Sequence, residues 1–349
     1  MPAPAGLVQQ LDQHLHRRRL LMPNMRMLVA CSGGADSVAL LKLFHAVNQS
    51  DHWHWELIVG HVNHQLRGRE STRDELFVRN LAKSLQLPFR SRKLNLKRSG
   101  EKRAVSENVA RDGRYQALLT MAAGSRCDVI LLAHHADDQA ETILMRLLRG
   151  AGVTGLAGMS EKERRGDVQL VRPLLPWPGE KLRNWLTDIH QPWREDLSNQ
   201  DPRYLRNRIR HELLPTLETY QPRIRELLQR NARHDRAAAD FLKQHARALL
   251  RAARYRRGSY GVSFSTVGIA NAHPAPAALA LRMAIVDAGG DEDTINTTTL
   301  LEVLDKLHNR SLRGEIQFGG GMRLKVLRNR INIHRASRNG GRQRRPGKC

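Results

Sequence analysis

The sequence predicts an α/β protein with a doubly wound parallel sheet, followed by a smaller, mainly helical domain that ends in a β-hairpin. Over the first half of the chain, short strand-like stretches alternate with amphipathic helical ones, and this alternation favours parallel strands joined by right-handed crossovers. Farther along, helical patterns dominate, and two adjacent strand patterns near residue 320 predict the hairpin.

The elements of the first half follow from their apolar periodicity. The expected strands are short and span residues 27–31, 56–61, 89–93 and 129–133. The expected helices between and after them span residues 36–47, 72–85, 106–123 and 137–149.

The second half opens with a Gly- and Pro-rich connection over residues 150–180, which holds one short strand near 168–172. The helical patterns that follow span residues 180–190, 204–214, 222–255, 277–288 and 298–307. The last strands are expected at residues 315–318, 322–327 and 330–334. We therefore expect domains over residues 1–215 and 216–335, followed by a basic, disordered tail over 336–349.

The composition describes a soluble globular protein with a polyanionic partner. The 349 residues include 58 Lys and Arg against 34 Asp and Glu, which gives a net charge of +24. Such an excess costs self-repulsion, and a basic surface of this kind is typical of nucleic-acid binding. An arginine-rich proteome is the alternative explanation.

The three cysteines, Cys31, Cys127 and Cys349, are far apart and form no CxxC pair. This usage favours a reducing cytoplasm and argues against zinc or an iron–sulfur cluster. We expect no membrane span and no secretory signal, because no apolar run has the required length or position.

The segment Ser-Gly-Gly-Ala-Asp-Ser lies between the first predicted strand and the following helix. Glycines ahead of a helix N-terminus allow backbone N–H groups to surround an anion, and the serines add hydroxyl donors. The spacing matches neither a Walker loop nor a dinucleotide fingerprint. An ordinary strand-to-helix turn is the alternative. The candidate phosphate-binding residues are Ser32, Gly33, Gly34, Ala35, Asp36 and Ser37.

A second polar segment, His-His-Ala-Asp-Asp-Gln-Ala-Glu-Thr, begins at residue 134, where the fourth strand gives way to a helix. Asp138 and Glu141 are three residues apart and share a helix face, so together they can hold a metal ion or a primary ammonium group. A well-capped helix start explains one carboxylate but not three, Asp137 included. If the first and fourth strands are neighbours, both segments face one crevice.

Two basic segments complete the pattern. Asp-Leu-Ser-Asn at 196–199 precedes Tyr-Leu-Arg-Asn-Arg-Ile-Arg at 204–210, and Arg111 and Arg114 share a face of an earlier helix. Such side chains can pair with phosphates or a base edge, or they can form a solvated basic face.

Together these motifs resemble the tRNA(Ile)-lysidine synthetases, a family of N-type ATP pyrophosphatases of the PP-loop superfamily. The Ser-Gly-Gly-Ala-Asp-Ser loop is shared across that superfamily. The acidic segment at 134–142 and the basic segment at 204–210 are much more specific to the tRNA(Ile)-lysidine synthetases. The resemblance is strong over residues 25–215 and weaker beyond.

The resemblance implies an adenine-nucleotide alpha-hydrolase-like fold and a two-step ligation. ATP adenylates the C2 carbonyl oxygen of the wobble cytidine, position 34, in tRNA(Ile) with a CAU anticodon. The amine of free L-lysine then attacks C2 and expels AMP. The product, lysidine, pairs with A, so codon reading changes from AUG to AUA.

The resemblance also assigns roles to residues. The loop at 32–37 binds ATP, Asp36 and Asp137 lie on the catalytic or metal side, and Mg²⁺ is bound through Asp36. Asp138 and Glu141 hold lysine. The expected contacts to tRNA, the cytidine or phosphates are Arg111, Arg114, Asn199, Arg206, Asn207 and Arg208. Further residues expected near ATP, or else ordinary polar loop residues, are His61, Asn63, His64 and Arg67.

The implied partners are tRNA(Ile), lysine and ATP, with a homodimer left open, and residues 216–335 form a tRNA-binding domain. One alternative is a tRNA-thiolating enzyme of the same superfamily, although that chemistry generally needs a cysteine pair or a cluster. Another is an RNA-binding module without catalysis. Pyrophosphate release that requires both tRNA and lysine distinguishes the three.

Overall fold

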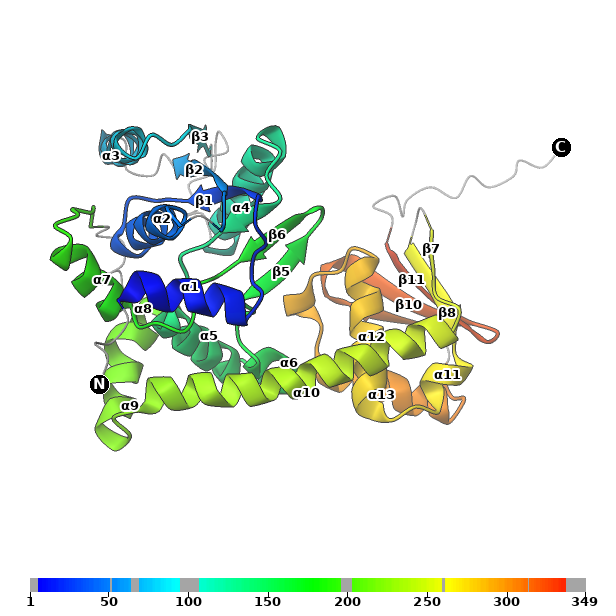
Figure 1. The fold of residues 1–349 in the computed structure, drawn as a ribbon. Helices are drawn as coiled ribbons and strands as arrows, with labels where there is room; N and C mark the ends of the chain where they lie inside the picture. The colour runs from blue at the N-terminus through cyan, green and yellow to red at the C-terminus, as the bar shows by residue number, and fades with distance from the viewer. Residues whose placement is uncertain are drawn as a thin grey trace. The chain divides into compact units, whose positions relative to one another are not determined.

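The computed structural model describes residues 6–50, 52–63, 69–94, 107–195, 203–258, 261–312 and 314–336. The chain forms two compact units, Met1–His234 and Asp235–Cys349, and each is described by itself (Figure 1). The division between the units falls within helix α10 (Ile224–Ala252), later than the boundary expected at residue 215.

The first unit is built on a six-stranded sheet in the order β3-β2-β1-β4-β6-β5. All neighbouring strands are parallel except β5, which runs antiparallel to β6. The strands are β1 (Arg26–Ala30), β2 (Glu56–Asn63), β3 (Phe89–Lys93), β4 (Val129–Leu131), β5 (Lys162–Arg165) and β6 (Val168–Val171). The predicted doubly wound parallel sheet is confirmed, and β5 is an additional edge strand that was not predicted.

Helices cover both faces of this sheet because its central strands are apolar on both sides. On β1, Met27 and Val29 belong to one buried cluster with α1 and α2, while Leu28 belongs to another with Tyr115 of α4. The helices are α1 (Leu7–Arg17), α2 (Ala35–Val47), α3 (Arg69–Ser84), α4 (Glu107–Gly124), α5 (Ala136–Leu148), α6 (Val153–Leu156) and α7 (Gly179–Asp188). Helix α1 was not predicted.

The strand order reverses between β1 and β4, which pair directly, with Leu28 opposite Ile130. Ligands of doubly wound sheets bind at such a point, beyond the carboxyl ends of the strands. The loop at 32–37 follows β1, and α5 begins shortly after β4. The two polar motifs can share one crevice only if these strands are neighbours, and the pairing shows that they are.

A short helical segment folds back over α5. It consists of α8 (Leu205–Arg208), a π-helical turn η2 (Ile209–Leu213) and α9 (Leu214–Tyr220), and it leads into α10. Ile209 and Leu214 pack against Ala140 and Leu144 of α5 in a separate apolar cluster. This packing fixes the basic residues of the segment above the acidic face of α5.

The second unit contains a five-stranded antiparallel sheet in the order β7-β8-β11-β10-β9. The predicted hairpin is confirmed, and it is extended by two strands that were not predicted, β7 and β8. The elements are β7 (Arg256–Gly258), β8 (Gly261–Ser265), α11 (Val267–Ala270), α12 (Pro274–Asp287), α13 (Thr297–His308), β9 (Glu315–Phe318), β10 (Met322–Leu327) and β11 (Arg330–Arg335). In the part of the chain that the structure describes, no helix combines the length and apolarity needed to cross a bilayer.

Candidate active site

The loop after β1 is organised by the hydroxyl of Ser37. This oxygen accepts the backbone N–H groups of Ser32 at 3.1 Å and Gly33 at 3.2 Å, and it donates to the Gly34 carbonyl at 2.9 Å. Gly33 has a φ of +100°, which favours glycine. Helix α2 has no side-chain cap in the described structure, so its first N–H groups point towards a position suited to an anion.

Asp36 lies in the first turn of α2 and faces α5. Its Oδ2 atom is 3.4 Å from Nε2 of His135. Its Oδ1 atom is shielded from solvent and has no hydrogen-bond partner among the described residues. A carboxylate oxygen without a hydrogen-bond donor is the type of ligand that Mg²⁺ prefers, so the residue fits the expected metal role.

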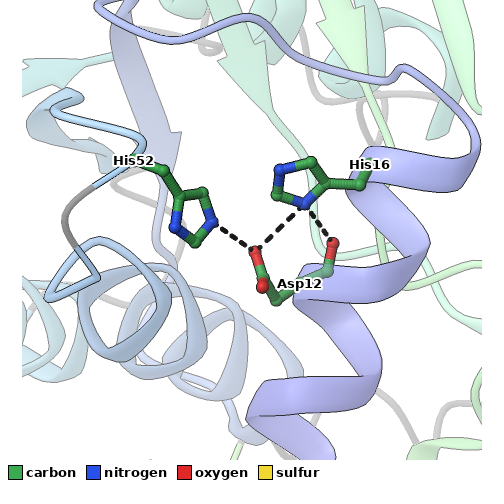
Figure 2. A group of neighbouring side chains, drawn as sticks. All are labelled: Asp12, His16 and His52. Carbon is green, nitrogen blue, oxygen red and sulfur yellow. Dashed lines mark hydrogen bonds and ion pairs between the residues drawn. The ribbon is translucent and has the colours of Figure 1, made fainter.

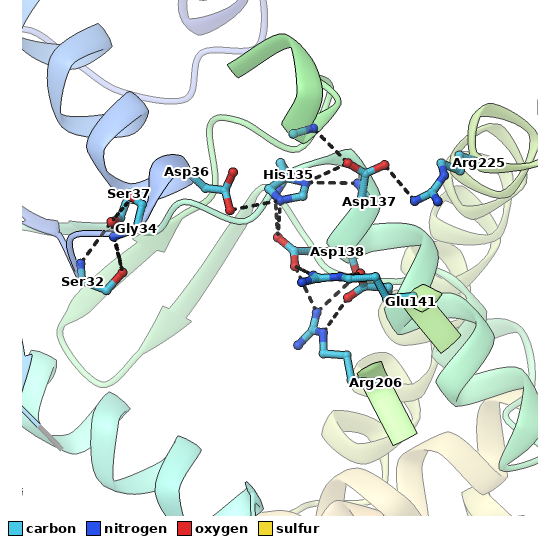
Figure 3. A network of polar contacts seen from close by, with 12 residues as sticks. Ser32, Gly34, Asp36, Ser37, His135, Asp137, Asp138, Glu141, Arg206 and Arg225 are labelled. Atoms are coloured by element: carbon cyan, nitrogen blue, oxygen red, sulfur yellow. Dashed lines mark hydrogen bonds and ion pairs between the residues drawn. The ribbon is translucent and has the colours of Figure 1, made fainter. Parts of the chain in front are cut away.

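His135, which precedes α5, joins the loop to the acidic helix (Figure 3). Its Nε2 atom lies between Oδ2 of Asp36 at 3.4 Å and Oδ2 of Asp138 at 3.5 Å, and its Nδ1 atom is 3.4 Å from Oδ2 of Asp137. When Nδ1 carries no proton it can instead accept the N–H of Asp137 at 3.2 Å. Burial alone lowers the pKa of this imidazole, but the three carboxylates outweigh burial and raise the pKa to about 10.

His135 was not among the predicted site residues. The only sequence signal for it is a pair of histidines at the end of a strand, and its neighbour behaves differently. Burial lowers the pKa of His134 to about 3, and its Nδ1 atom has no partner among the described residues. Near neutral pH the His135 imidazole is therefore positively charged, whereas the adjacent His134 imidazole is neutral.

Asp137 connects α5 to two other parts of the first unit. One oxygen accepts the backbone N–H of Gly179 at 2.9 Å, and the other is 3.1 Å from Arg225 at the start of α10. Burial raises the pKa of Asp137, but His135, the Gly179 N–H and Arg225 together hold it well below its usual range. Its carboxylate links α7 and the first turn of α10 to α5.

Asp138 and Glu141 face two arginines from the segment that folds over α5. The Glu141 carboxylate is fully buried, and its oxygens are 2.7 Å from Arg206 Nε and 2.6 Å from Arg210 Nε. Asp138 is 15% exposed and its contacts are longer, 3.4 Å to Arg206 and 3.5 Å to Arg210. The predicted ammonium-binding pair therefore lies in an ion-pair network, and Asp138 is its more accessible member. Arg210 belongs to the basic segment predicted at 204–210, but its pairing with these carboxylates was not predicted.

The other predicted residues fall into three groups. Arg111 and Arg114 lie on α4 and are exposed, and Arg208 is exposed and faces Glu212 at 3.6 Å, whereas Asn207 is buried. His61 and Asn63 lie on β2 and serve the scaffold. Outside the described residues are His64, Arg67 and Asn199.

The contacts of the β2 residues explain this scaffold role. His61 Nδ1 is 2.9 Å from the Cys31 carbonyl directly before the loop, and burial lowers the pKa of this histidine. Asn63 donates to Glu75 at 3.0 Å and to the Ser71 carbonyl at 3.2 Å. Both residues hold neighbouring backbone and helix α3 in place.

Comparison with known proteins agrees with this geometry. A family model described as a PP-loop domain matches residues 6–217. A tRNA(Ile)-lysidine synthase from Synechococcus sp. is 37% identical over 236 residues, which cover 67% of this chain and 70% of that relative. The corresponding protein from Nostoc sp. is 35% identical over 246 residues and 69% of each chain. The chain belongs to the PP-loop family and, within it, to the tRNA(Ile)-lysidine synthases.

Other relatives are longer. The tRNA(Ile)-lysidine synthase of Geobacter sulfurreducens is 42% identical over 214 residues, which cover 61% of this chain but only 44% of that relative. The chain thus spans about half the length of several curated relatives, at 44%, 51% and 55%. Among solved structures, the U34-tRNA thiolase NcsA from Methanococcus maripaludis matches with a TM-score of 0.53 at 16% identity, covering 65% of this chain and 78% of that one. This likeness concerns the fold alone.

The bridge through His135 predicts a particular pH dependence of stability. Because its folded-state pKa of about 10 exceeds the ordinary value of 6.5, its stabilising contribution is complete below pH 6.5 and is lost as pH rises through 10. The stability difference between the wild type and His135→Asn, which keeps a helix-capping side chain, should narrow by up to about 1.4 kcal/mol per pH unit over this window. Urea unfolding at intervals from pH 6 to pH 10 measures it.

His134→Asn is the matched control, since folded His134 stays neutral in this window and its stability difference should be flat above about pH 7.5, where the unfolded-state imidazole is neutral too. A flat difference for His135→Asn as well would show that the imidazole is not a charged bridge.

Proposed function

We propose that this protein ligates L-lysine to C2 of the wobble cytidine of tRNA(Ile) with a CAU anticodon, in the cytoplasm, converting ATP to AMP and pyrophosphate. The observation that carries the proposal is the contact of Asp36 in the phosphate-type loop with Asp138 on α5 through His135. A nucleotide-activating element and an ammonium-binding element thus share one edge of the sheet. Relatives named tRNA(Ile)-lysidine synthase supply the substrate class.

In the first step the C2 carbonyl oxygen attacks the α-phosphorus of ATP, and pyrophosphate leaves. Negative charge grows on the pyrophosphate oxygens, where the first N–H groups of α2 and the positive end of its helix dipole stabilise it. Mg²⁺, held by Asp36, would neutralise part of that charge. The unpartnered Oδ1 atom of Asp36 supports this role.

In the second step an unprotonated amino group of lysine attacks C2, its surplus proton passes to water, the C2–oxygen bond breaks, and AMP leaves. We assign the contact with the lysine ammonium group to Asp138, because it is the more accessible carboxylate and its ion pairs are longer. Glu141, which is fully buried, holds Arg206 and Arg210 in place. Those arginines then flank the reacting nucleotide and its phosphate.

The exposed arginines Arg111, Arg114 and Arg208 are proposed contacts for the tRNA backbone, in keeping with the net charge of +24. The same role stays a prediction for Asn199 and for the tail at 336–349. Thiolation is less well supported, because Cys31 and Cys127 are buried and burial raises the pKa of each thiol to about 11. Such thiols are poor nucleophiles near neutral pH.

The direct test is incubation with a tRNA(Ile) transcript carrying CAU, ATP and labelled lysine, followed by nuclease digestion and analysis of nucleoside 34. Label should enter that nucleoside only when ATP is present, with one AMP formed per lysine. A tRNA(Met) transcript with the same anticodon is the control. AMP formation without lysine incorporation at position 34 would contradict the proposal.

Replacing Asp36 by alanine should lower the rate of AMP formation by about 10²-fold or more, as loss of an electrostatic stabiliser does. The side chain is 37% exposed and lies outside the apolar clusters, so the fold should persist. Single-turnover AMP release, with circular dichroism as the folding control, measures the effect. A folded variant with wild-type turnover would remove Asp36 from the mechanism.

Asp138→Asn and Glu141→Gln should behave differently. Asp138→Asn should weaken lysine binding by about 2 kcal/mol or more while adenylated tRNA still forms. Glu141→Gln leaves Arg206 and Arg210 without a full counter-charge and should cost about 3–5 kcal/mol of stability. Lysine titration of the reaction and urea unfolding separate the two effects, and an unchanged KM for lysine in Asp138→Asn would move the amine site elsewhere.

A further inference from the structure

A second polar cluster lies away from the active site, where α1 meets the segment between α2 and β2. Asp12 and His16 are four residues apart on α1 and therefore share a face, and His52 approaches them from that segment (Figure 2). Asp12 Oδ1 is 3.3 Å from His52 Nε2 and 3.4 Å from His16 Nδ1. One ligand-type atom from each residue lies within 4.8 Å of the other two.

Both separations from Asp12 Oδ1 match those between the ligand atoms of a transition-metal site, and a bound ion would replace the contact of His16 Nδ1 with the Asp12 backbone carbonyl at 3.1 Å. A tetrahedral Zn²⁺ site with ligand bonds of about 2.1 Å spaces its ligand atoms about 3.4 Å apart. Two imidazoles and one carboxylate, with water in the fourth position, form a ligand set that zinc commonly takes. We propose that Asp12, His16 and His52 bind Zn²⁺.

The surroundings of the cluster support a cation. The buried indole of Trp53 donates to Asp12 Oδ1 at 2.6 Å, an outer-shell hydrogen bond of the kind that orients ligating carboxylates. The Trp53 ring centroid is 4.3 Å from that of His16 and 5.2 Å from that of His52, and it is stacked on Trp55 at 4.4 Å. His16 also lies in the last turn of α1, where the helix dipole favours positive charge.

The position indicates a structural role. The Asn24 N–H bonds to the Trp53 carbonyl at 2.8 Å, and these residues precede β1 and β2 respectively. The cluster therefore lies at the amino-terminal edge of the sheet, whereas the candidate active site lies at the carboxyl edge. Bound Zn²⁺ would link α1 to the segment before β2, and it would take no part in the reaction at the candidate active site. The absence of CxxC pairs bears only on cysteine sites, so it does not argue against this one.

The test uses the untagged full-length chain, stripped with EDTA and titrated with Zn²⁺ by calorimetry and by thermal unfolding. The wild type should bind one Zn²⁺ ion at this site and unfold at a higher temperature when loaded. Asp12→Asn keeps an oxygen acceptor for Trp53, and His52→Gln alters an exposed side chain, so both should fold. Each should bind at least about tenfold more weakly, in line with the 10–100-fold losses seen even for outer-shell changes.

His54→Asn is the matched control, because His54 is exposed in the same segment but outside the cluster, and it should bind like the wild type. Quenching of tryptophan fluorescence by Cu²⁺ gives an independent readout, because the Trp53 indole touches the cluster. Trp53→Phe should therefore remove most of this quenching. Equal Zn²⁺ affinity in the wild type, Asp12→Asn and His52→Gln, or no binding by the wild type, would overturn the proposal.

Discussion

The candidate active site depends on the charge of one imidazole. His135 lies between Asp36, which follows β1, and Asp138, which follows β4, and the order of the sheet makes those two strands neighbours. Without a proton on His135, carboxylates from two separate motifs would face each other and repel. With the proton, the loop and α5 are joined, because three carboxylates raise the pKa of the ring to about 10 despite its burial.

The network around this bridge is close to neutral. Its acidic members are Asp36, Asp137, Asp138 and Glu141, and its basic members are His135, Arg206, Arg210 and Arg225. Buried ion pairs of this kind add little net stability, because desolvation offsets their attraction, but removal of one member is costly. The main effect of the network is therefore to fix the relative positions of the helices that carry its side chains. It holds α7, α8 and the first turn of α10 against α5.

The sequence predicted the elements that have strong apolar patterns or contiguous motifs. The central strands, the loop at 32–37 and the acidic start of α5 were all located within a few residues, since each depends on local chemistry. Strands β5 and β7 were missed because Lys162–Arg165 and Arg256–Gly258 are polar edge strands, whose hydrogen bonds come from a neighbour rather than from an apolar face.

The predicted site was incomplete for a similar reason. His135 gains its role only when β4 lies beside β1, and Arg210 gains its partner only when the segment after residue 203 folds back over α5. The cluster of Asp12, His16 and His52 also joins residues 40 apart in the sequence. Contacts between residues far apart in the sequence are set by tertiary packing, and a single sequence carries no local pattern that indicates them.

The charge of His135 is measured most directly by ¹⁵N NMR titration of the histidine side chains, with the His135 signals assigned from their loss in His135→Asn. If His135 bridges Asp36 and Asp138 as an imidazolium, both of its ring nitrogens are protonated at pH 7.5 and the ring titrates towards a pKa of about 10. A neutral His135 at pH 7.5, titrating near the ordinary histidine value, would show that no charged bridge joins the loop to α5.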